Sequence, residues 1–369
     1  MKILQLTAHF RPNIGGVETH LSDLCKALTE RGFEVTVLTY RPLETDLKWK
    51  MLEREKNLTI VRIPWIPRLF YRLIKLPILE FIYLFPGLFL ATPFVLLWKK
   101  IDVISAHGIV AGFVGAFWGK VFGKRVVIST HSIYNFPKAG LYRKFVTWIF
   151  KNASFCLGLS KQSEKEISSL GISSQKVNSF TYWIDLDKFK VKKRLGRSGK
   201  FTVLFVGRLV KEKGILELLE SVKTWNKNIN LKIIGSGPLE KKIKRAAGKY
   251  KNVEFIGIID PDQLPLYYSG SDILIVPSLA EEGFGRVILE SLACGTPVIG
   301  SNRGAIPEAM DGTVGRLIDV TPSHIKEAVE YFFNNQEKLR ELAQNCRRFA
   351  ERRYSEKNVE KIIRAYYQR

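Results

Sequence analysis

The sequence predicts an α/β protein built from two Rossmann-like domains, each with a parallel sheet covered by helices. Three observations lead to this prediction. Short apolar runs that predict buried strands alternate with helical segments along the whole chain. Glycine-bearing loops follow several of these strands and lead into helices. The chain also has 369 residues, enough for two domains with separate hydrophobic cores.

The composition is that of a globular protein, with 46% hydrophobic and 25% charged residues. The four cysteines are far apart and form no C-x-x-C pair, so we expect buried thiols in a reducing compartment. They are Cys25, Cys156, Cys294 and Cys346. The start, MKILQLTA, carries one charge and leads directly into a strand, which is not typical of a signal peptide. We therefore expect a cytoplasmic location.

The net charge of +23 is concentrated in the first half of the chain. Residues 1–200 contain 32 Lys and Arg against 14 Asp and Glu, whereas residues 201–369 contain 26 against 21. The surplus is most marked from Arg62 to Lys151, with 13 basic and 2 acidic residues. Such a field attracts phosphate groups on nucleic acid or on anionic lipid. A nucleic-acid binder is disfavoured, because the aromatic residues lie in apolar runs and are not interleaved with basic ones.

The first expected strand, Ile3–Thr7, is followed by a glycine-bearing loop and by the helix Val17–Arg31, which should stop at Gly32. Gly15 and Gly16 lie where the backbone must approach a ligand or turn sharply. The alternative is a simple turn at the start of a helix. The loop is not G-x-G-x-x-G, which argues against a dinucleotide-binding dehydrogenase.

The segment from Trp65 to Lys100 is dense in Phe, Leu, Ile, Tyr and Trp, with Arg68, Arg72 and Lys75 near its start. Phe81–Trp98 has 18 residues without a charge, the lower limit for a membrane-spanning helix. Spanning would place the two halves of one sheet on opposite sides of a bilayer, so we reject it. We expect Pro77, Pro86, Gly87 and Pro93 to cut the segment into shorter helices, part core and part membrane surface. The alternative is an internal helical layer over the sheet.

Two histidines, His107 and His131, follow the ends of the expected strands Asp102–Ala106 and Val126–Thr130. In the second half, Arg208 and Lys213 lie five residues apart in a strand-to-helix loop, so both side chains can converge on one pair of phosphates. A basic solvated loop is the alternative for this pair.

The stretch Pro277–Val298 combines a strand end, a glycine-bearing loop and a helix start. Gly283, Phe284 and Gly285 precede the helix, whose first amides suit a phosphate or sugar hydroxyls. Glu282 and Glu290 are separated by two helical turns, so we expect one to contact the transferred group and the other a ribose. The alternative is an amphipathic helix with two solvated glutamates.

These motifs together resemble retaining glycosyltransferases of the two-Rossmann-domain (GT-B) type, family 4, also called glycosyl transferases group 1. They are P-x-x-G-G-V-E after the first strand, G-R-x-x-x-x-K-G at Gly207–Gly214, and E-x7-E beside G-F-G. The resemblance covers nearly the whole chain and implies a deep interdomain cleft. It also implies that a nucleotide-diphospho-sugar binds in this cleft, mainly to the second domain.

The resemblance implies a role for each matching residue. Arg208, Lys213 and the amides of Gly15 and Gly16 would bind the diphosphate, together with the helix start at Gly283, Phe284 and Gly285. Glu282 would hold hydroxyls of the donor hexose and Glu290 those of the ribose. His131 would face the transferred hexose, His107 would line the cleft, and the main chain from Gly257 to Ile259 would edge the nucleobase.

The resemblance also defines the expected domains. They are residues 1–183 as the acceptor domain, with a membrane-facing segment at about 65–100, residues 184–354 as the nucleotide-sugar domain, and a final helix in 355–369, expected over Ser355–Tyr367, that crosses back to the first domain. Family members have an Asn-Gly pair at the crossover, where this chain has Tyr182-Trp183-Ile184-Asp185. The spacing of Asp185 and Phe189 is kept.

The expected activity is metal-independent transfer of a hexosyl group, with retention, from a UDP- or GDP-sugar without a cofactor. The first domain resembles that of the phosphatidylinositol-glycosylating members, so the expected acceptor is a lipid and the expected location is the inner face of a membrane. The alternatives are a soluble saccharide acceptor and a nucleotide-sugar epimerase.

Overall fold

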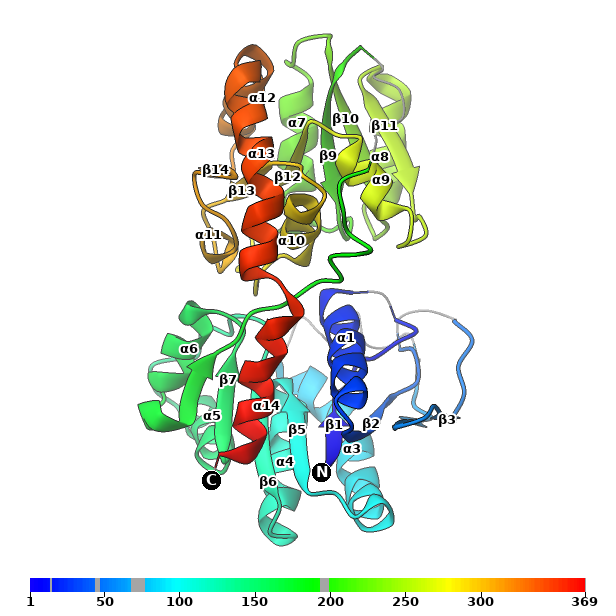
Figure 1. Ribbon diagram of the computed structural model, residues 1–369, viewed down its shortest axis with the longest axis vertical. Helices are drawn as coiled ribbons and strands as arrows, with labels where there is room; N and C mark the ends of the chain where they lie inside the picture. The colour runs from blue at the N-terminus through cyan, green and yellow to red at the C-terminus, as the bar shows by residue number, and fades with distance from the viewer. Residues whose placement is uncertain (14, 44–46, 68–76, 193–198, 369) are drawn as a thin grey trace. The chain divides into compact units, whose positions relative to one another are not determined.

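The computed structural model describes residues 1–13, 15–43, 47–67, 77–192 and 199–368 (Figure 1). The basic residues Arg68, Arg72 and Lys75 lie outside the described residues. The chain divides into two compact units. Unit 1 comprises Met1–Thr181 and Asn358–Arg369, and unit 2 comprises Tyr182–Lys357. Each unit contains one mainly parallel sheet with helices, so the predicted α/β class with two Rossmann-like domains is confirmed.

The sheet of unit 1 has the strand order β3-β4-β2-β1-β5-β6-β7-β8. Its strands are β1 Lys2–Leu6, β2 Glu34–Tyr40, β3 Leu52–Arg54, β4 Leu58–Ile63, β5 Val103–His107, β6 Arg125–Thr130, β7 Phe155–Gly158 and β8 Val177–Ser179. All neighbours are parallel except β3 and β4. The order reverses between β1 and β5, and such a switch point opens a crevice at the carboxyl ends of the strands.

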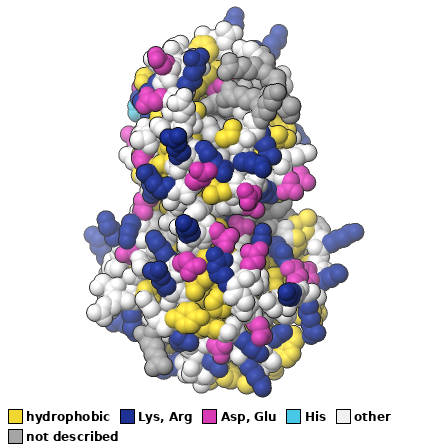
Figure 2. All heavy atoms as spheres, in the orientation of Figure 1, with side chains coloured by type: hydrophobic (Ala, Val, Ile, Leu, Met, Phe, Trp, Pro, Cys, Tyr) yellow, Lys and Arg dark blue, Asp and Glu magenta, His cyan; other side chains and the backbone are white. Residues whose placement is uncertain are grey.

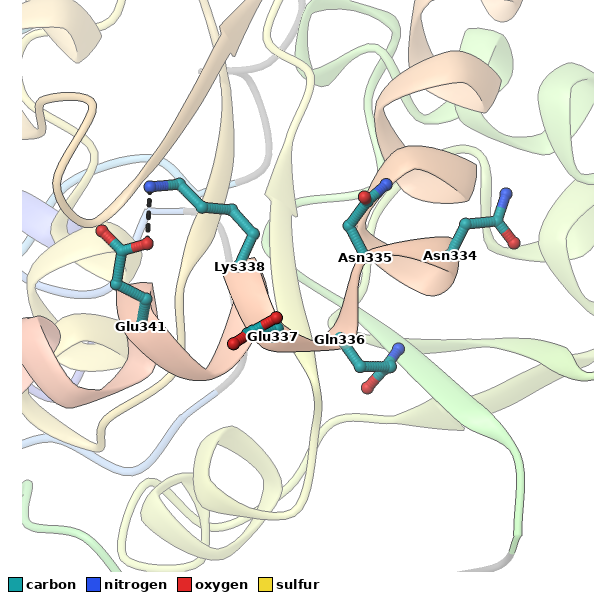
Figure 3. Close-up of a pocket in the computed structure, with 6 residues that line it drawn as sticks. All are labelled: Asn334, Asn335, Gln336, Glu337, Lys338 and Glu341. Carbon is teal, nitrogen blue, oxygen red and sulfur yellow. Dashed lines mark hydrogen bonds and ion pairs between the residues drawn. The ribbon is translucent and has the colours of Figure 1, made fainter.

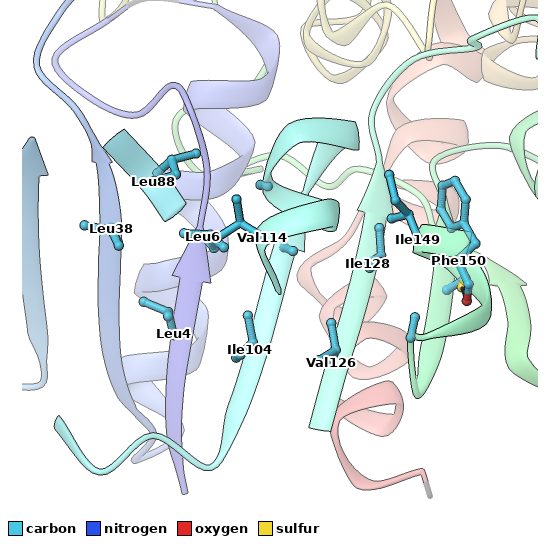
Figure 4. Packing of buried hydrophobic residues seen from close by; sticks show 14 of the residues in the cluster. Leu4, Leu6, Leu38, Leu88, Ile104, Val114, Val126, Ile128, Ile149 and Phe150 are labelled. Atoms are coloured by element: carbon cyan, nitrogen blue, oxygen red, sulfur yellow. Dashed lines mark hydrogen bonds between the residues drawn. The ribbon is translucent and has the colours of Figure 1, made fainter. Parts of the chain in front are cut away.

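The helices of unit 1 pack on this sheet through apolar faces. They are α1 Gly16–Glu30, α3 Pro77–Lys99, α4 Gly108–Val121, α5 Leu141–Lys151, α6 Lys161–Ser168 and α14 Val359–Tyr367. Figure 4 shows the core in which Leu6, Ile104 and Ile128 of three neighbouring strands meet Val114 of α4. Helix α4 comes so close to the sheet that a Cβ at Gly119 would lie 2.2 Å from the side chain of Val126. Glycine is therefore required where α4 crosses β6.

Helix α3 is continuous from Pro77 to Lys99, so the expectation that prolines cut this segment into shorter helices was wrong. Pro77 begins the helix, where a missing N–H costs nothing, and Pro86 and Pro93 lie inside it. Pro93 has no N–H to donate to the carbonyl of Phe89, four residues earlier in the helix. This carbonyl instead accepts a hydrogen bond of 2.9 Å from Trp118 Nε1 on α4. A donor from the neighbouring helix thus compensates the interruption.

The turn around Pro86 also receives hydrogen bonds from side chains outside the helix. The Tyr40 hydroxyl donates to the Leu84 carbonyl and accepts from the Leu88 amide at 3.0 Å, so it stands between two groups that would normally pair along the helix. Trp65 Nε1 donates to the neighbouring carbonyl of Tyr83 at 2.9 Å. A Cβ at Gly87 would lie 2.6 Å from the Tyr40 ring, so only glycine leaves room for the ring at this position.

The sheet of unit 2 has the order β11-β10-β9-β12-β13-β14 and is parallel throughout. Its strands are β9 Phe201–Val206, β10 Ile229–Ile234, β11 Val253–Gly257, β12 Ile273–Val276, β13 Val298–Ser301 and β14 Gly315–Ile318. Its helices are α7 Ile215–Val222, α8 Glu240–Lys249, α9 Leu264–Ser269, α10 Arg286–Ala293, α11 Ile306–Ala309, α12 Pro322–Asn334 and α13 Gln336–Arg353, with the short 3₁₀ turn η2 at Lys211–Lys213. The order reverses between β9 and β12, which creates a second switch point.

The last helix is shorter than expected. The sequence predicted a helix over Ser355–Tyr367, but α14 begins at Val359 after a 3₁₀ turn at Glu356–Asn358. Asn358 directly precedes the first helical residue. Tyr366, near the end of α14, is fully buried in unit 1.

The Tyr40 bridge leads to a first prediction. Replacing Tyr40 by Phe removes the hydroxyl but keeps the ring, and leaves two buried backbone groups of α3 without their side-chain partner. We expect the free energy of unfolding, measured with urea, to fall by about 1–3 kcal/mol. Tyr367→Phe, which alters an exposed ring, should change it by less than about 0.5 kcal/mol. Equal effects of the two variants would contradict the bridge.

Candidate functional site

The predicted donor-binding residues of unit 2 meet at its switch point. Arg208 and Lys213 lie in the loop that follows β9, and Glu282 lies in the loop that follows β12. Because β9 and β12 are neighbouring parallel strands at the reversal of strand order, their carboxyl ends open into the same crevice. Residues that are about seventy positions apart in the sequence thus lie at the same edge of the sheet.

Lys213 and Glu282 form a close ion pair. Lys213 Nζ donates to Glu282 Oε1 at 2.5 Å, and the Ser278 hydroxyl donates to the same oxygen. The two charged side chains are largely but not fully buried. The pair therefore holds a cation and a carboxylate side by side, with an edge accessible to a ligand.

Close backbone contacts hold the two loops together. Gly214 has a positive φ of 66°, and a Cβ there would lie 1.7 Å from the Pro277 carbonyl oxygen. The amides of Leu279 and Ala280 both donate to the Glu212 carbonyl, at 2.8 and 3.2 Å. Lys213 lies between Glu212 and Gly214, so these contacts position it against Glu282.

A third loop, which follows β13, fixes the backbone of Glu282. The Ala305 amide donates to the Glu282 carbonyl at 2.9 Å. A Cβ at Gly304, whose φ is 57°, would lie 2.5 Å from the Glu282 nitrogen. Glu282 therefore has little freedom on either side.

Glu290 lies in a separate, more deeply buried cluster. Its side chain accepts from Arg286 Nε at 3.2 Å and from the Tyr268 hydroxyl at 2.8 Å. Burial raises the pKa of the Glu290 carboxyl, while Arg286 and Tyr268 oppose the rise. Glu282 and Glu290 thus have different partners, as the two turns between them imply.

The remaining predicted residues of unit 2 surround these clusters. Arg208 is exposed just after β9, and Phe284 is buried with its ring 6.0 Å from that of Tyr354. Gly283 is half-buried, and Gly285 directly precedes α10 with a φ of 70°. Gly257 ends β11 with a φ of 86°, its carbonyl accepts from the Gly235 amide, and Ile259 is half-buried.

The predicted residues of unit 1 lie at its own switch point. His107 is the last residue of β5 and His131 follows β6, while Gly15 and Gly16 begin α1 after the loop from β1. Both histidines are buried, with His107 Nδ1 2.9 Å from His131 Nε2. Burial lowers the pKa of His131 to about 3 and that of His107 well below its usual value, with His131 as a further cause. Both rings are therefore neutral at pH 7.

The structure adds partners that the sequence reasoning missed. Ser278, Tyr268 and Arg286 complete the clusters of unit 2. In unit 1, Gln5 contacts His107, and Tyr366 contacts Gln5 in turn. Only Arg286 carried a sequence signal, because it lies one helical turn before Glu290. Within the described residues, no group of three His, Cys, Asp or Glu side chains is arranged to hold a metal ion.

A hollow of about 440 Å³ lies elsewhere in unit 2, at the junction of α12 and α13 (Figure 3). Polar side chains line it, and Lys338 pairs with Glu341 at 2.8 Å. It contains none of the residues predicted for the donor site.

The contact between Gly214 and Pro277 leads to a second prediction. Gly214→Ala would place a methyl group into the Pro277 carbonyl at a positive φ, so the free energy of unfolding should fall by at least about 1–3 kcal/mol. Gly248→Ala, in α8 with open space around the added Cβ, should be neutral or stabilising by up to about 1 kcal/mol. Urea denaturation of both variants checks this, and a Gly214→Ala protein as stable as the parent would refute the close approach.

Two family models match the chain. The model described as Glycosyltransferase Family 4 matches residues 14–188, and the model described as Glycosyl transferases group 1 matches residues 187–352. An uncharacterized glycosyltransferase of Methanocaldococcus jannaschii is 26% identical, with 99% of this chain and 98% of that protein covered.

Two further relatives have described activities. A GDP-mannose-dependent phosphatidylinositol monomannoside mannosyltransferase of Mycolicibacterium smegmatis is 26% identical over 86% of this chain and 85% of its own. A phosphatidylinositol N-acetylglucosaminyltransferase subunit from Arabidopsis thaliana is 23% identical over 89% of this chain and 74% of its own.

Solved structures show the same fold. Sucrose-phosphate synthase from Thermosynechococcus elongatus superposes with a TM-score of 0.79 at 22% identity, covering 100% of this chain and 98% of that one. Anabaena HepE in complex with UDP superposes with a TM-score of 0.78 at 21% identity, covering 99% and 98%. With the two family models spanning residues 14–352, the chain belongs to the GT-B glycosyltransferases that join a Glycosyltransferase Family 4 domain to a glycosyl transferases group 1 domain.

Proposed function

We propose that this glycosyltransferase moves a hexosyl group, with retention, from a UDP- or GDP-sugar to a lipid-linked acceptor at the cytoplasmic face of a membrane. The observation that carries the donor chemistry is the ion pair of Lys213 and Glu282 at the switch point of unit 2. A cation suits the diphosphate of such a donor, and a neighbouring carboxylate suits the hydroxyls of its sugar.

The leaving diphosphate gains negative charge as its bond to the sugar breaks. Lys213 and Arg208, both in the loop after β9, supply positive charge to it, and the first amides of α10 near Gly283 and Gly285 add hydrogen-bond donors. These groups would make an obligatory metal ion unnecessary, and we expect no cofactor. The nucleotide-bound structures of the Anabaena protein, with UDP and with UDP-glucose, support a nucleotide-sugar as the donor.

Retention fits the engagement of Glu282. Its Oε1 already accepts from Lys213 and Ser278, so this oxygen is poorly suited to attack the anomeric carbon as a nucleophile. We expect the acceptor oxygen to bond to that carbon on the face that the diphosphate leaves. The acceptor proton passes to a diphosphate oxygen, so the atoms balance without an enzyme-bound sugar.

The other predicted residues keep their proposed roles. Glu290, whose carboxylate is oriented by Arg286 and Tyr268, would bind the ribose, and the backbone from Gly257 to Ile259 would edge the nucleobase. In unit 1, Gly15 and Gly16 would direct amides at the diphosphate, and His131 would face the transferred hexose.

The proposed membrane surface lies on α3 in unit 1. One face of this helix enters the core through Tyr83, Leu84, Leu88 and Leu96. The opposite face is apolar and carries two groups of exposed side chains, one at positions 78 and 82 and one at positions 90, 94 and 97, three or four residues apart within each group. Their exposed fractions are Ile78 69%, Ile82 60%, Leu90 65%, Phe94 73% and Leu97 66%. An apolar stripe of this length, beside basic side chains, is typical of a helix that lies in the plane of a membrane.

By length and composition, Ile78–Lys99 could also cross a bilayer, and it is the one such helix among the described residues. Its packing favours the in-plane position, because α3 connects β4 to β5 within one sheet. Helix α5 extends the surface with exposed Leu141 and Trp148 beside Lys144 and Lys151. Figure 2 shows Lys and Arg side chains spread over the face in view, in keeping with the net charge of +23.

Two further observations support the acceptor and the location. The relatives from Mycolicibacterium and Arabidopsis are described as acting on phosphatidylinositol compounds. All four cysteines are free and buried, which suits the reducing environment of the cytoplasm.

The proposed diphosphate clamp leads to a third prediction. Lys213→Ala removes a charge that stabilises the departing diphosphate, so kcat for donor turnover should fall on the order of 10²–10³-fold, with a similar loss for Arg208→Ala. Lys211→Ala removes an exposed cation from the same turn and serves as the matched control, with kcat within about twofold of the parent. Wild-type turnover in both clamp variants would show that the assignment is wrong.

The α3 stripe leads to a fourth prediction, measured by co-sedimentation with vesicles of neutral or anionic phospholipid across a salt series. We expect micromolar binding to anionic vesicles at low salt, weakened by salt, since each basic residue near the surface contributes about 1 kcal/mol. Replacing Leu90 and Phe94 together by Ser should reduce the binding at least tenfold, whereas Leu266→Ser in unit 2 should not. A protein that stays in the supernatant with anionic vesicles at low salt would exclude the lipid surface and favour a soluble acceptor.

A further inference from the structure

A chain of buried polar side chains in unit 1 connects the last helix to His131. Gln5 of β1 and Ser105 of β5 both contact the Tyr366 hydroxyl of α14, at 3.2 and 3.1 Å. The Gln5 carbonyl oxygen lies 2.6 Å from His107 Nε2, and His107 Nδ1 lies 2.9 Å from His131 Nε2. All five side chains are less than one-tenth exposed, so water cannot replace these partners at little cost.

The hydrogen bonds in this chain have a definite direction. The Gln5 amide nitrogen can only donate, and it faces the Tyr366 oxygen, which in turn donates to Ser105. The Gln5 carbonyl oxygen can only accept, so His107 must carry its proton on Nε2. Neutral His107 then has a lone pair on Nδ1, and only a proton on His131 Nε2 can complete the contact.

Burial keeps both imidazole rings neutral. It lowers the pKa of His131 to about 3 and the pKa of His107 well below its usual value, so each ring carries one proton at pH 7. His131 with its proton on Nε2 can only accept at Nδ1, which suits a sugar hydroxyl as the donor. The hydrogen bonds from Tyr366 through Gln5 and His107 thus determine which nitrogen of His131 carries the proton. His131 is the residue with the proposed substrate contact.

We propose that Tyr366 and Gln5 are positioning residues that act through His107 to hold His131 in its Nε2–H tautomer. Tyr366 lies on α14, which the chain reaches only after passing through unit 2. Correct seating of this C-terminal helix in unit 1 therefore sets the hydrogen-bonding state of His131. The importance of this state for catalysis rests on the proposed function, in which His131 faces the transferred hexose.

The direction depends on the orientation of the Gln5 amide. If the amide were turned over, its nitrogen would donate to His107 Nε2, and every proton along the chain would move to the opposite atom. His131 would then carry its proton on Nδ1. The tautomer of His131 therefore reports the direction of the hydrogen bonds from Tyr366 to His131, and it can be measured without substrate.

The experiment is ¹⁵N NMR of the full chain labelled at histidine, in the absence of donor, with the His131 signals assigned by a His131→Gln variant. We expect the Nε2–H tautomer of His131 at pH 7. Tyr366→Phe keeps the ring but releases Gln5, and should give a mixture of the two His131 tautomers. Gln5→Met, which removes both amide groups at similar volume, should do the same. Tyr40→Phe removes another buried hydroxyl of unit 1 and should leave the His131 signals unchanged.

The Nδ1–H tautomer in the parent protein, or an unchanged Nε2–H signal in both variants, would overturn the proposal. Kinetics separate this failure from failure of the proposed function. With a mixed tautomer, Tyr366→Phe should lower kcat about three- to tenfold with the donor KM within about twofold, the effect of one hydrogen bond. If the tautomer changes while kcat does not, the tautomer relay stands and the proposed substrate contact of His131 is wrong.

Discussion

The close approach of Gly214 to Pro277 is the contact on which the rest of the donor site depends. It joins the loop after β9 to the loop after β12, and no side chain larger than hydrogen fits at position 214. The two loops are in backbone contact, and this contact holds Lys213 and Glu282 close enough for their side chains to form an ion pair. The resulting pair lies at the reversal of strand order, where parallel sheets generally bind ligands.

Unit 1 uses a different physical device at its own switch point. Its polar groups are buried and neutral, and their arrangement is specified by hydrogen-bond direction rather than by charge. Unit 2, in contrast, brings opposite charges together at a partly accessible edge. The two switch points therefore differ in the physical interaction that orders their side chains.

The sequence was sufficient for the fold class and for placing the motif loops at the ends of strands, because strand periodicity and glycine-bearing loops are local signals. It was insufficient where a distant group changes the outcome. Pro86 and Pro93 predicted breaks, but Trp118 donates to the carbonyl that Pro93 leaves without its helical partner. Tyr40 and Trp65, also from elsewhere in unit 1, bond the backbone around Pro86. Gln5 and Tyr366 are 361 positions apart, so no local pattern could have connected them to each other or to the histidines.

Transfer from a nucleotide-diphospho-sugar to a lipid is best tested by analysis of the reaction product. The protein would be incubated with radiolabelled UDP- and GDP-sugars and a membrane lipid extract, and the anomeric configuration of the product determined by NMR. The account predicts an organic-soluble labelled product whose anomeric configuration is that of the donor. Label found only on soluble saccharide would contradict the lipid acceptor, an inverted product would contradict retention, and no transfer from any nucleotide-sugar would contradict the account as a whole.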